Sequence, residues 1–440
     1  MNFKQSIQIT AHTVRYIRNQ WLSNGYFKRY QLKKLKEILT YSFQNVPFYR
    51  DTACRLKINA SNIASVDDLK NLPIVTKELI QEDPQRFLSV KGDRHLWFNS
   101  QSSGSTGEPV QVFFDPDCWL SSRYALKVRS LYAMGFPVWG KLVVVRIVEP
   151  EKLQQQWDSL KLPLESYFRR RRYLSTFESP EEHLKFYRQF RPHAIHGPPS
   201  YFRRLAEVNQ NGPKDTVRVP IVFCVSELLD RKTRLLVEEC FEAEVYDIYG
   251  CVEVKDVAWE CKAHNGYHIN AENVIVEVVQ EGDPLPDGQD GEILLTSLSN
   301  RAMPLIRYNV GDRGSLSERI CSCGRGLPMM NVIEGRSVDL IKLPNGNKLS
   351  PYKIINLFEE ISELKRFKII QRFDFSLDVY LTTSEASKTK KISLTSKVES
   401  ILRKELNSAI EIRCDIVKRI EVKPGEKCRF IRSELSAKEA

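Results

Sequence analysis

The sequence predicts a layered α/β protein, and three observations lead to this prediction. A chain of 440 residues is long for one hydrophobic core, so a large domain with a smaller companion is expected. From about residue 140, short β-branched runs alternate with polar helical stretches, which is typical of a core with much parallel sheet. After residue 290 the pattern changes to β-rich segments with turn signals, as in GEILLTSLS.

The first recognisable element is an amphipathic helix within residues 30 to 50. Leu32, Leu35, Ile38 and Leu39 share one helical face, and Pro47 ends the pattern. Later in the chain, the runs KLVVVRIV and VPIVFCVS read as strands, and the stretches SPEEHLKFYRQF and RKTRLLVEECF read as helices.

The C-terminal part of the sequence predicts a separate small domain. Asn345-Gly346 marks a tight hairpin, and helices are expected over Lys353 to Glu363 and Ser393 to Leu406. Between these helices, FKIIQRF and LDVYLTT read as strands. We therefore expect a large domain over residues 1–338 and a small α+β domain over residues 339–440, a size within the usual domain range.

Composition and charge restrict the class of protein but select no single partner. Hydrophobic residues make up 42% and charged residues 28%, as in ordinary folded proteins, and the formal charge of +11 favours polyanions. The basic residues are dispersed and no zinc-finger or RNP pattern accompanies them, so no specific nucleic acid is expected. No segment has the length and apolarity of a signal peptide or a transmembrane span, so the expected location is cytoplasmic.

A loop rich in hydroxyl groups and glycine is the most informative segment. Gly104 and Gly107 permit positive φ, so consecutive amides can point at one anion while hydroxyl groups add donors. On residue types alone, an ordinary surface loop is an equal alternative, and the loop lacks the Gly-Lys-Ser/Thr ending of a Walker A motif. The candidate phosphate-binding residues are Ser102, Ser103, Gly104, Ser105, Thr106 and Gly107.

Together with three later motifs in the same order, this loop resembles the phosphate loop of the adenylate-forming enzymes. Tyr246 to Glu253 is similar to the aromatic-Gly-x-x-Glu element, Arg307 to Asp312 to the Tyr-x-x-Gly-Asp element, and Gly335 to Asp339 to the hinge. The terminal Gly-x-Lys element is matched by Gly425 to Arg429.

Two N-terminal segments narrow the resemblance to one branch of that superfamily. Asn45 to Arg50 and Leu72 to Lys77 look like the corresponding segments of the phenylacetate-CoA ligase branch, which includes relatives in capsule-polysaccharide biosynthesis. The resemblance covers nearly the whole chain. It implies a large N-terminal adenylate-forming domain with layered sheets and helices, followed by a small mobile α+β domain.

The resemblance also implies a reaction. A small carboxylic acid would be activated with ATP as an acyl-adenylate and then transferred to a thiol acceptor, either coenzyme A or a carrier protein. The alternative is an adenylyltransferase that gives AMP to a hydroxyl or amine in surface-polysaccharide or coenzyme metabolism. A homodimer is left open.

The motifs assign roles to individual residues. Glu253 is the candidate carboxylate for Mg²⁺, and Lys427 of the small domain is the candidate catalytic cation at the α-phosphate. Tyr249, with Gly250 beside it, is suited to stacking on adenine, and the two oxygens of Asp312 suit the ribose hydroxyls. Arg336, with Asp339, matches the hinge about which the small domain would swing. The structural alternatives are a surface Glu, a half-buried Tyr, a turn Asp and one more lysine of a basic tail.

Cysteine and histidine spacing suggests a metal site. Two cysteine-containing turns lie beside the motifs, and four ligands from them would close a tetrahedral structural Zn²⁺ site. The choice of histidine is open, because His264 has zinc-knuckle spacing whereas His268 matches the Gly-x-His pattern of the resembled branch. The candidate ligands are Cys261, His264, His268, Cys321 and Cys323.

One departure from the superfamily concerns the phosphate loop. The loop usually ends in a lysine, but Val110 stands at that position here. The remaining grip on the phosphates must therefore come from other residues.

Overall fold

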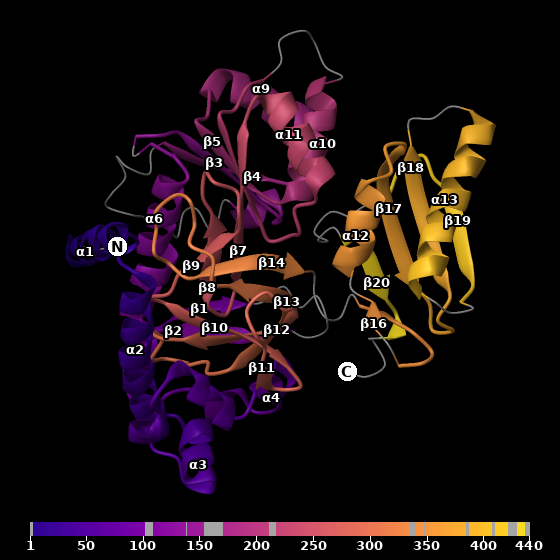
Figure 1. Ribbon diagram of the computed structural model, residues 1–440. Helices are drawn as coiled ribbons and strands as arrows, with labels where there is room; N and C mark the ends of the chain where they lie inside the picture. The colour runs from indigo at the N-terminus through magenta and orange to yellow at the C-terminus, as the bar shows by residue number, and fades with distance from the viewer. Residues whose placement is uncertain are drawn as a thin grey trace. The chain divides into compact units, whose positions relative to one another are not determined.

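The computed structural model describes residues 3–101, 109–137, 139–153, 170–210, 217–334, 340–346, 348–349, 351–383, 387–406, 410–420 and 429–435. The chain divides into two compact units. Figure 1 labels the helices and strands and colours the chain by residue number. The first comprises residues 1–140, 160–170 and 246–333, and the second comprises residues 141–159, 171–245 and 334–440. The boundary expected near residue 338 lies outside the described residues. Among the helices of the described ranges, none is long and apolar enough to cross a membrane.

Three helices begin the first unit: α1 (Phe3–Asn19), α2 (Asn24–Asn45) and α3 (Pro47–Leu56). Leu35, Ile38 and Leu39 of the predicted apolar face are buried, and Leu32 lies against the same hydrophobic cluster. Pro47 separates α2 from α3 because a proline, which has no N–H, is tolerated in the first turn of a helix but not in its interior.

The N-terminal segments are bonded directly to strands that follow much later in the chain. The Tyr49 hydroxyl accepts a hydrogen bond from the Ile306 amide at 3.0 Å, and the Gln31 amide group donates to the Val274 carbonyl at 3.0 Å. Val75 forms a parallel bridge with Tyr308, in which the Asn309 amide donates to the Val75 carbonyl at 2.8 Å. The two segments that indicated the ligase branch thus support the strand that begins at Tyr308.

The β-structure of the first unit is mostly antiparallel. In spatial order its strands are β11 (Asp283–Pro284), β10 (Val274–Gln280), β12 (Gly291–Ser297), β13 (Tyr308–Ser317), β14 (Met329–Glu334), β9 (Tyr267–Ile269), β8 (Lys255–Glu260) and β7 (Glu244–Cys251). A separate hairpin pairs β1 (Phe98–Gln101) with β2 (Gln111–Phe114).

Shorter helices complete the first unit. They are α4 (Lys77–Glu82), α5 (Pro116–Leu120), a π-helical turn (Ser121–Ala125) and α6 (Leu126–Ala133). Single 3₁₀ turns occur at Ala60–Asn62, Val66–Asn71, Pro84–Phe87 and Arg94–Leu96.

The second unit contains the parallel sheet that the alternating pattern predicts. Its strands lie in the order β6 (Ile221–Val225), β5 (Ala194–Gly197), β3 (Leu142–Arg146) and β4 (Arg171–Ser175), and each neighbouring pair is parallel. The helices α9 (Pro180–Phe190), α10 (Pro199–Gln210) and α11 (Arg231–Phe241) supply apolar residues to its core. Asp230 caps α11 by accepting from the Thr233 amide at 2.8 Å.

The C-terminal part of the second unit is α+β, as expected. Its elements are β15 (Ile341–Lys342), β16 (Lys348–Leu349), α12 (Pro351–Glu359), β17 (Leu364–Gln371), β18 (Leu377–Thr383), α13 (Lys388–Leu406), β19 (Ile412–Ile416) and β20 (Ile431–Ser433). Four of these strands form one sheet in the order β19-β18-β17-β20. The predicted Asn345-Gly346 turn joins β15 to β16, and Gly346 has φ of +84°.

Candidate active site

Tyr249 and Gly250 lie at the end of β7, and Glu253 lies in the turn between β7 and β8. A β-bulge lies between Tyr249 and Gly250, where β7 pairs with β8. A Cβ atom at position 250 would lie 2.6 Å from the Lys255 carbonyl oxygen, which is closer than real Cβ contacts allow. Glycine is therefore required here for the two strands to approach and form the turn that holds Glu253.

Tyr249 is paired with Asp312. The Tyr249 hydroxyl donates to the Asp312 Oδ2 at 2.9 Å. Burial raises the pKa of Tyr249 well above its usual value, and the negative charge of Asp312 raises it further. The phenol therefore keeps its proton at neutral pH, and it holds the carboxylate of β13 beside the end of β7.

Glu253 is paired with Tyr308, so here the tyrosine comes from the later motif and the carboxylate from the earlier one. The Tyr308 hydroxyl donates to Glu253 Oε1 at 3.1 Å, and Glu253 is only 8% exposed. Burial, followed by the charge of Glu253, raises the pKa of Tyr308, so this phenol also remains a donor. The sequence did not predict either tyrosine–carboxylate pair.

Arg307 and Gly311 shape the backbone at the start of β13. Arg307 has φ of +51°, and its guanidinium bonds Glu277 at 3.1 Å and the Leu72 carbonyl at 2.9 Å. Gly311 has φ of +80°, and its amide donates to the Asn309 side chain at 2.9 Å. These contacts fix the backbone on either side of Tyr308 and just before Asp312.

Several predicted site residues lie outside the described residues. They are Ser102, Ser103, Gly104, Ser105, Thr106 and Gly107 of the glycine-rich loop, Arg336 of the hinge, and Lys427. Gln101 of β1, just before the loop, pairs with Gln111 of β2. Val110, at the usual lysine position, is only 3% exposed and belongs to the hydrophobic core.

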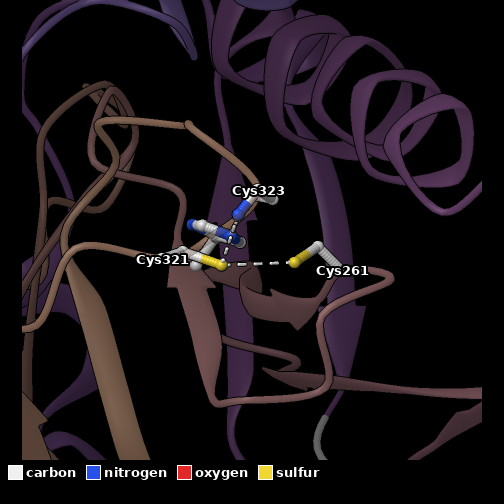
Figure 2. A group of neighbouring side chains, drawn as sticks. Cys261, Cys321 and Cys323 are labelled. Atoms are coloured by element: carbon white, nitrogen blue, oxygen red, sulfur yellow. Dashed lines mark hydrogen bonds between the residues drawn. The ribbon is translucent and has the colours of Figure 1, made fainter.

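Three cysteines and one histidine converge near the other end of β8. One ligand atom from each of Cys261, His268, Cys321 and Cys323 lies within 4.8 Å of the others. Cys261 Sγ is 3.5 Å from Cys321 Sγ, and Cys323 Sγ is 3.3 Å from His268 Nε2. Figure 2 shows the sulfur atoms of Cys261 and Cys321 facing each other, with the backbone nitrogen of Cys323 directed at the Cys321 sulfur.

His264 is not brought into this group. Its Nδ1 lies 3.6 Å from Glu260 Oε2, and its ring stacks on Tyr246 with the centroids 5.1 Å apart. His268 is placed by strand register, because it pairs with Met329 between β9 and β14. The fold therefore places His268, and not His264, beside the three cysteines.

The four side chains fit a structural metal site of the zinc type. Thiolate and imidazole are the usual ligands of structural Zn²⁺, and four protein ligands leave no open position for a substrate. Burial, together with the charges of Arg325 and Arg129, lowers the pKa of His268 to about 3, so the imidazole is in the neutral form that binds metals. The arrangement suits a role in joining two turns beside the active-site motifs.

Comparisons with known proteins agree with this architecture. No protein-family model matches the chain. The phenylacetate-coenzyme A ligase of Escherichia coli is 26% identical over 408 residues, covering 88% of this chain and 89% of that protein. Protein CapK of Staphylococcus aureus is 21% identical over 414 residues, covering 91% of this chain and 88% of CapK.

A solved structure extends the likeness to the fold of nearly the whole chain. The crystal structure of 2-hydroxyisobutyryl-CoA ligase in complex with 2-HIB-AMP superposes with a TM-score of 0.79 at 20% identity. The match covers 96% of this chain and 93% of that structure. At this identity the likeness is one of fold.

Proposed function

Since this chain is related to the phenylacetate-CoA ligase branch of the adenylate-forming enzymes, we propose that it is an acid–thiol ligase of that type. It would activate a carboxylic acid with ATP and transfer the acyl group to coenzyme A. The observation that supports the proposal is a crossed pairing, in which Tyr249 bonds Asp312 and Tyr308 bonds Glu253, each tyrosine pairing with the carboxylate of the other motif. This pairing joins the motif of Asp312, the proposed ribose ligand, to the motif of Glu253, the proposed Mg²⁺ ligand.

The proposed reaction has two steps. In the first, a carboxylate oxygen attacks the α-phosphorus of ATP, the bond to the β-phosphate oxygen breaks, and pyrophosphate leaves. In the second, the sulfur of coenzyme A attacks the acyl carbon, the carbon–oxygen bond to AMP breaks, and the thiol proton is released. The first step joins two anions, so it requires positive charge around the phosphates.

Each described motif residue has a task in the first step. The Tyr249 ring would lie against adenine while its hydroxyl keeps Asp312 oriented toward the ribose hydroxyls. Glu253, oriented by Tyr308, would hold Mg²⁺, which when bound neutralises phosphate charge. The backbone and hydroxyl groups of residues 102–107 would bind the phosphates, and Lys427 would stabilise charge at the α-phosphate, as the resemblance implies.

We also propose that Cys261, His268, Cys321 and Cys323 hold a structural Zn²⁺. The metal would connect the turn after β8 with the turn before β14. β8 begins two residues after Glu253, and β13, which carries Asp312, is the strand before the second turn. This role is separate from catalysis.

The proposed function is tested by detecting the intermediate. The protein is incubated with ATP, Mg²⁺ and a panel of aryl, hydroxy and sugar-derived acids, and acyl-AMP is sought by mass spectrometry alongside acid-dependent pyrophosphate exchange. We expect Glu253→Gln to reduce exchange by at least about a hundredfold, given the value of one preorganised electrostatic contact in a transition state. The exposed Glu281→Gln is the matched control.

Two outcomes would contradict the proposal. Exchange that depends on a hydroxyl or amine acceptor instead of a free acid would make the protein an adenylyltransferase. Equal exchange rates in the Glu253→Gln variant and in the Glu281→Gln control would remove Glu253 from the reaction.

A further inference from the structure

A second group of side chains in the first unit carries charge that the proposed chemistry does not use. Lys255 is the first residue of β8, and its Nζ lies 4.2 Å from the ring centre of Phe114 and 5.0 Å from that of Trp119. Arg123, in the π-helical turn, has its Cζ 4.8 Å from the centre of the same Trp119 ring. Two cations from distant parts of the chain therefore contact one indole.

These cations have no carboxylate partner among the described residues. The Lys255 ammonium donates a hydrogen bond to the Ser100 hydroxyl at 2.8 Å. Both cations contact the centre of one ring, so they are no more than roughly 10 Å apart, about one Debye length. Among the described residues, no carboxylate lies within ion-pair distance of either cation, so an anion bound between them would gain favourable charge contacts.

The lining of this site is aromatic. Phe98 stacks on Trp119 with the ring centroids 4.9 Å apart and the planes 3° from parallel, and Phe114 lies 5.5 Å from Trp119. Phosphate sites are commonly built from backbone amides, whereas aromatic walls with a few polar groups are typical of sites for organic molecules. Trp119, Arg123 and Lys255 are all only partly buried, so a solute can reach them.

The site also lies close in sequence to the reacting centre. Lys255 follows Glu253 by two positions, and Ser100 stands two positions before Ser102, the first residue of the glycine-rich loop. Lys255 and its hydrogen-bond partner Ser100 thus stand next to the two motifs that are proposed to bind Mg²⁺ and the phosphates.

We propose that Lys255 and Arg123 bind a second anionic group on the acid substrate, so that the protein favours dicarboxylic acids over their uncharged counterparts. This inference rests on the proposed function and narrows its substrate class. The ammonium supplies a point charge, and the guanidinium can pair with both oxygens of a carboxylate. The aromatic rings would contact the carbon skeleton between the two acid groups.

Matched acids test the inference. Pyrophosphate exchange is compared for 4-carboxyphenylacetate against phenylacetate and for glutarate against pentanoate. We expect kcat/KM to be at least about tenfold higher for the dicarboxylic member, the order expected for a hydrogen bond to a charged group. Lys255→Met and Arg123→Met should each bring this ratio toward one, whereas Lys255→Arg should largely retain it. Lys33→Met, an exposed lysine of α2, is the control for loss of one positive charge.

The results that would overturn the inference differ from those that would overturn the proposed function. Preference for the uncharged acids, or a ratio that both Met variants leave unchanged, contradicts the second-anion site while leaving the ligase intact. A rise in KM for ATP alone in Lys255→Met would assign the cations to the triphosphate. If no acid supports exchange, the proposed function fails. The anion site would still be supported if calorimetry shows that 4-carboxyphenylacetate binds and that Lys255→Met, with an unchanged melting temperature, weakens this binding. Equal binding by both proteins would exclude the site.

Discussion

Each of the two motif carboxylates accepts a hydrogen bond from a tyrosine that belongs to the other motif. Asp312 accepts from Tyr249, and Glu253 accepts from Tyr308. A displacement of either strand would therefore disturb both carboxylates together. At the residue scale, this crossed pairing makes the tyrosine hydroxyl groups positioning groups, in addition to any contact that the rings make with the nucleotide.

The Tyr249 hydroxyl and its ring can be tested separately. Tyr249→Phe keeps the ring but removes the donor to Asp312, and we expect a loss of about tenfold in kcat/KM for ATP, as for a hydrogen bond to a charged acceptor. Tyr249→Ala should lose more, because adenine contact is lost as well. Equal effects of the two variants would show that the ring is not used. Tyr132→Phe, at a position 51% exposed, is the control.

Residue patterns could identify the motif carboxylates but not their partners or the second cation site. Glu253 and Asp312 lie in short motifs whose order along the chain is recognisable. Lys255 and Arg123 have no shared motif, and only the packing of β8 beside the π-helical turn brings them to Trp119. Contacts of this kind join residues that are far apart in the chain, and local patterns in a single sequence do not show which distant residues meet.

At the scale of elements, periodicity located the helices and strands better than it located their ends. The predicted strand LDVYLTT corresponds to β18 (Leu377–Thr383), and RKTRLLVEECF corresponds to α11 (Arg231–Phe241). The helix expected over Ser393 to Leu406 begins earlier, at Lys388, and the helix expected to reach Glu363 ends at Glu359. The polar residues at these ends carry little hydrophobic pattern, so the helix limits depend on local packing.

The proposed structural Zn²⁺ site, which joins two turns, gives a prediction at the scale of elements. The purified protein should contain roughly one zinc per chain, and Cys323→Ser should lose it with a fall in melting temperature of roughly 10 °C, as expected for loss of a structural site worth several kcal/mol. Cys54→Ser, at an exposed cysteine, should retain the metal and the melting temperature. A metal-free protein with the same melting temperature in both variants would exclude the site.

At the scale of the whole molecule, the proposed two-step reaction assigns Lys427 to the first step alone. Lys427→Ala is expected to reduce acyl-AMP formation by about a hundredfold or more, because a cation at the transferred phosphate is lost. Transfer from supplied acyl-AMP to coenzyme A should be affected far less. The exposed Lys418→Ala is the control. Unchanged adenylation in Lys427→Ala would contradict the proposed swing of the small domain.

The contacts of the N-terminal helices have a consequence for the integrity of the folded chain. Tyr49 and Gln31 bond to residues more than two hundred positions later, while the turn after α3 at Lys57 is exposed and has φ of +53°. A protease that cuts after Lys57 should therefore leave two fragments that elute as a single particle in native gel filtration and separate only in denaturant. The helices before the cut would behave as a non-covalent subunit of the domain whose strand they support.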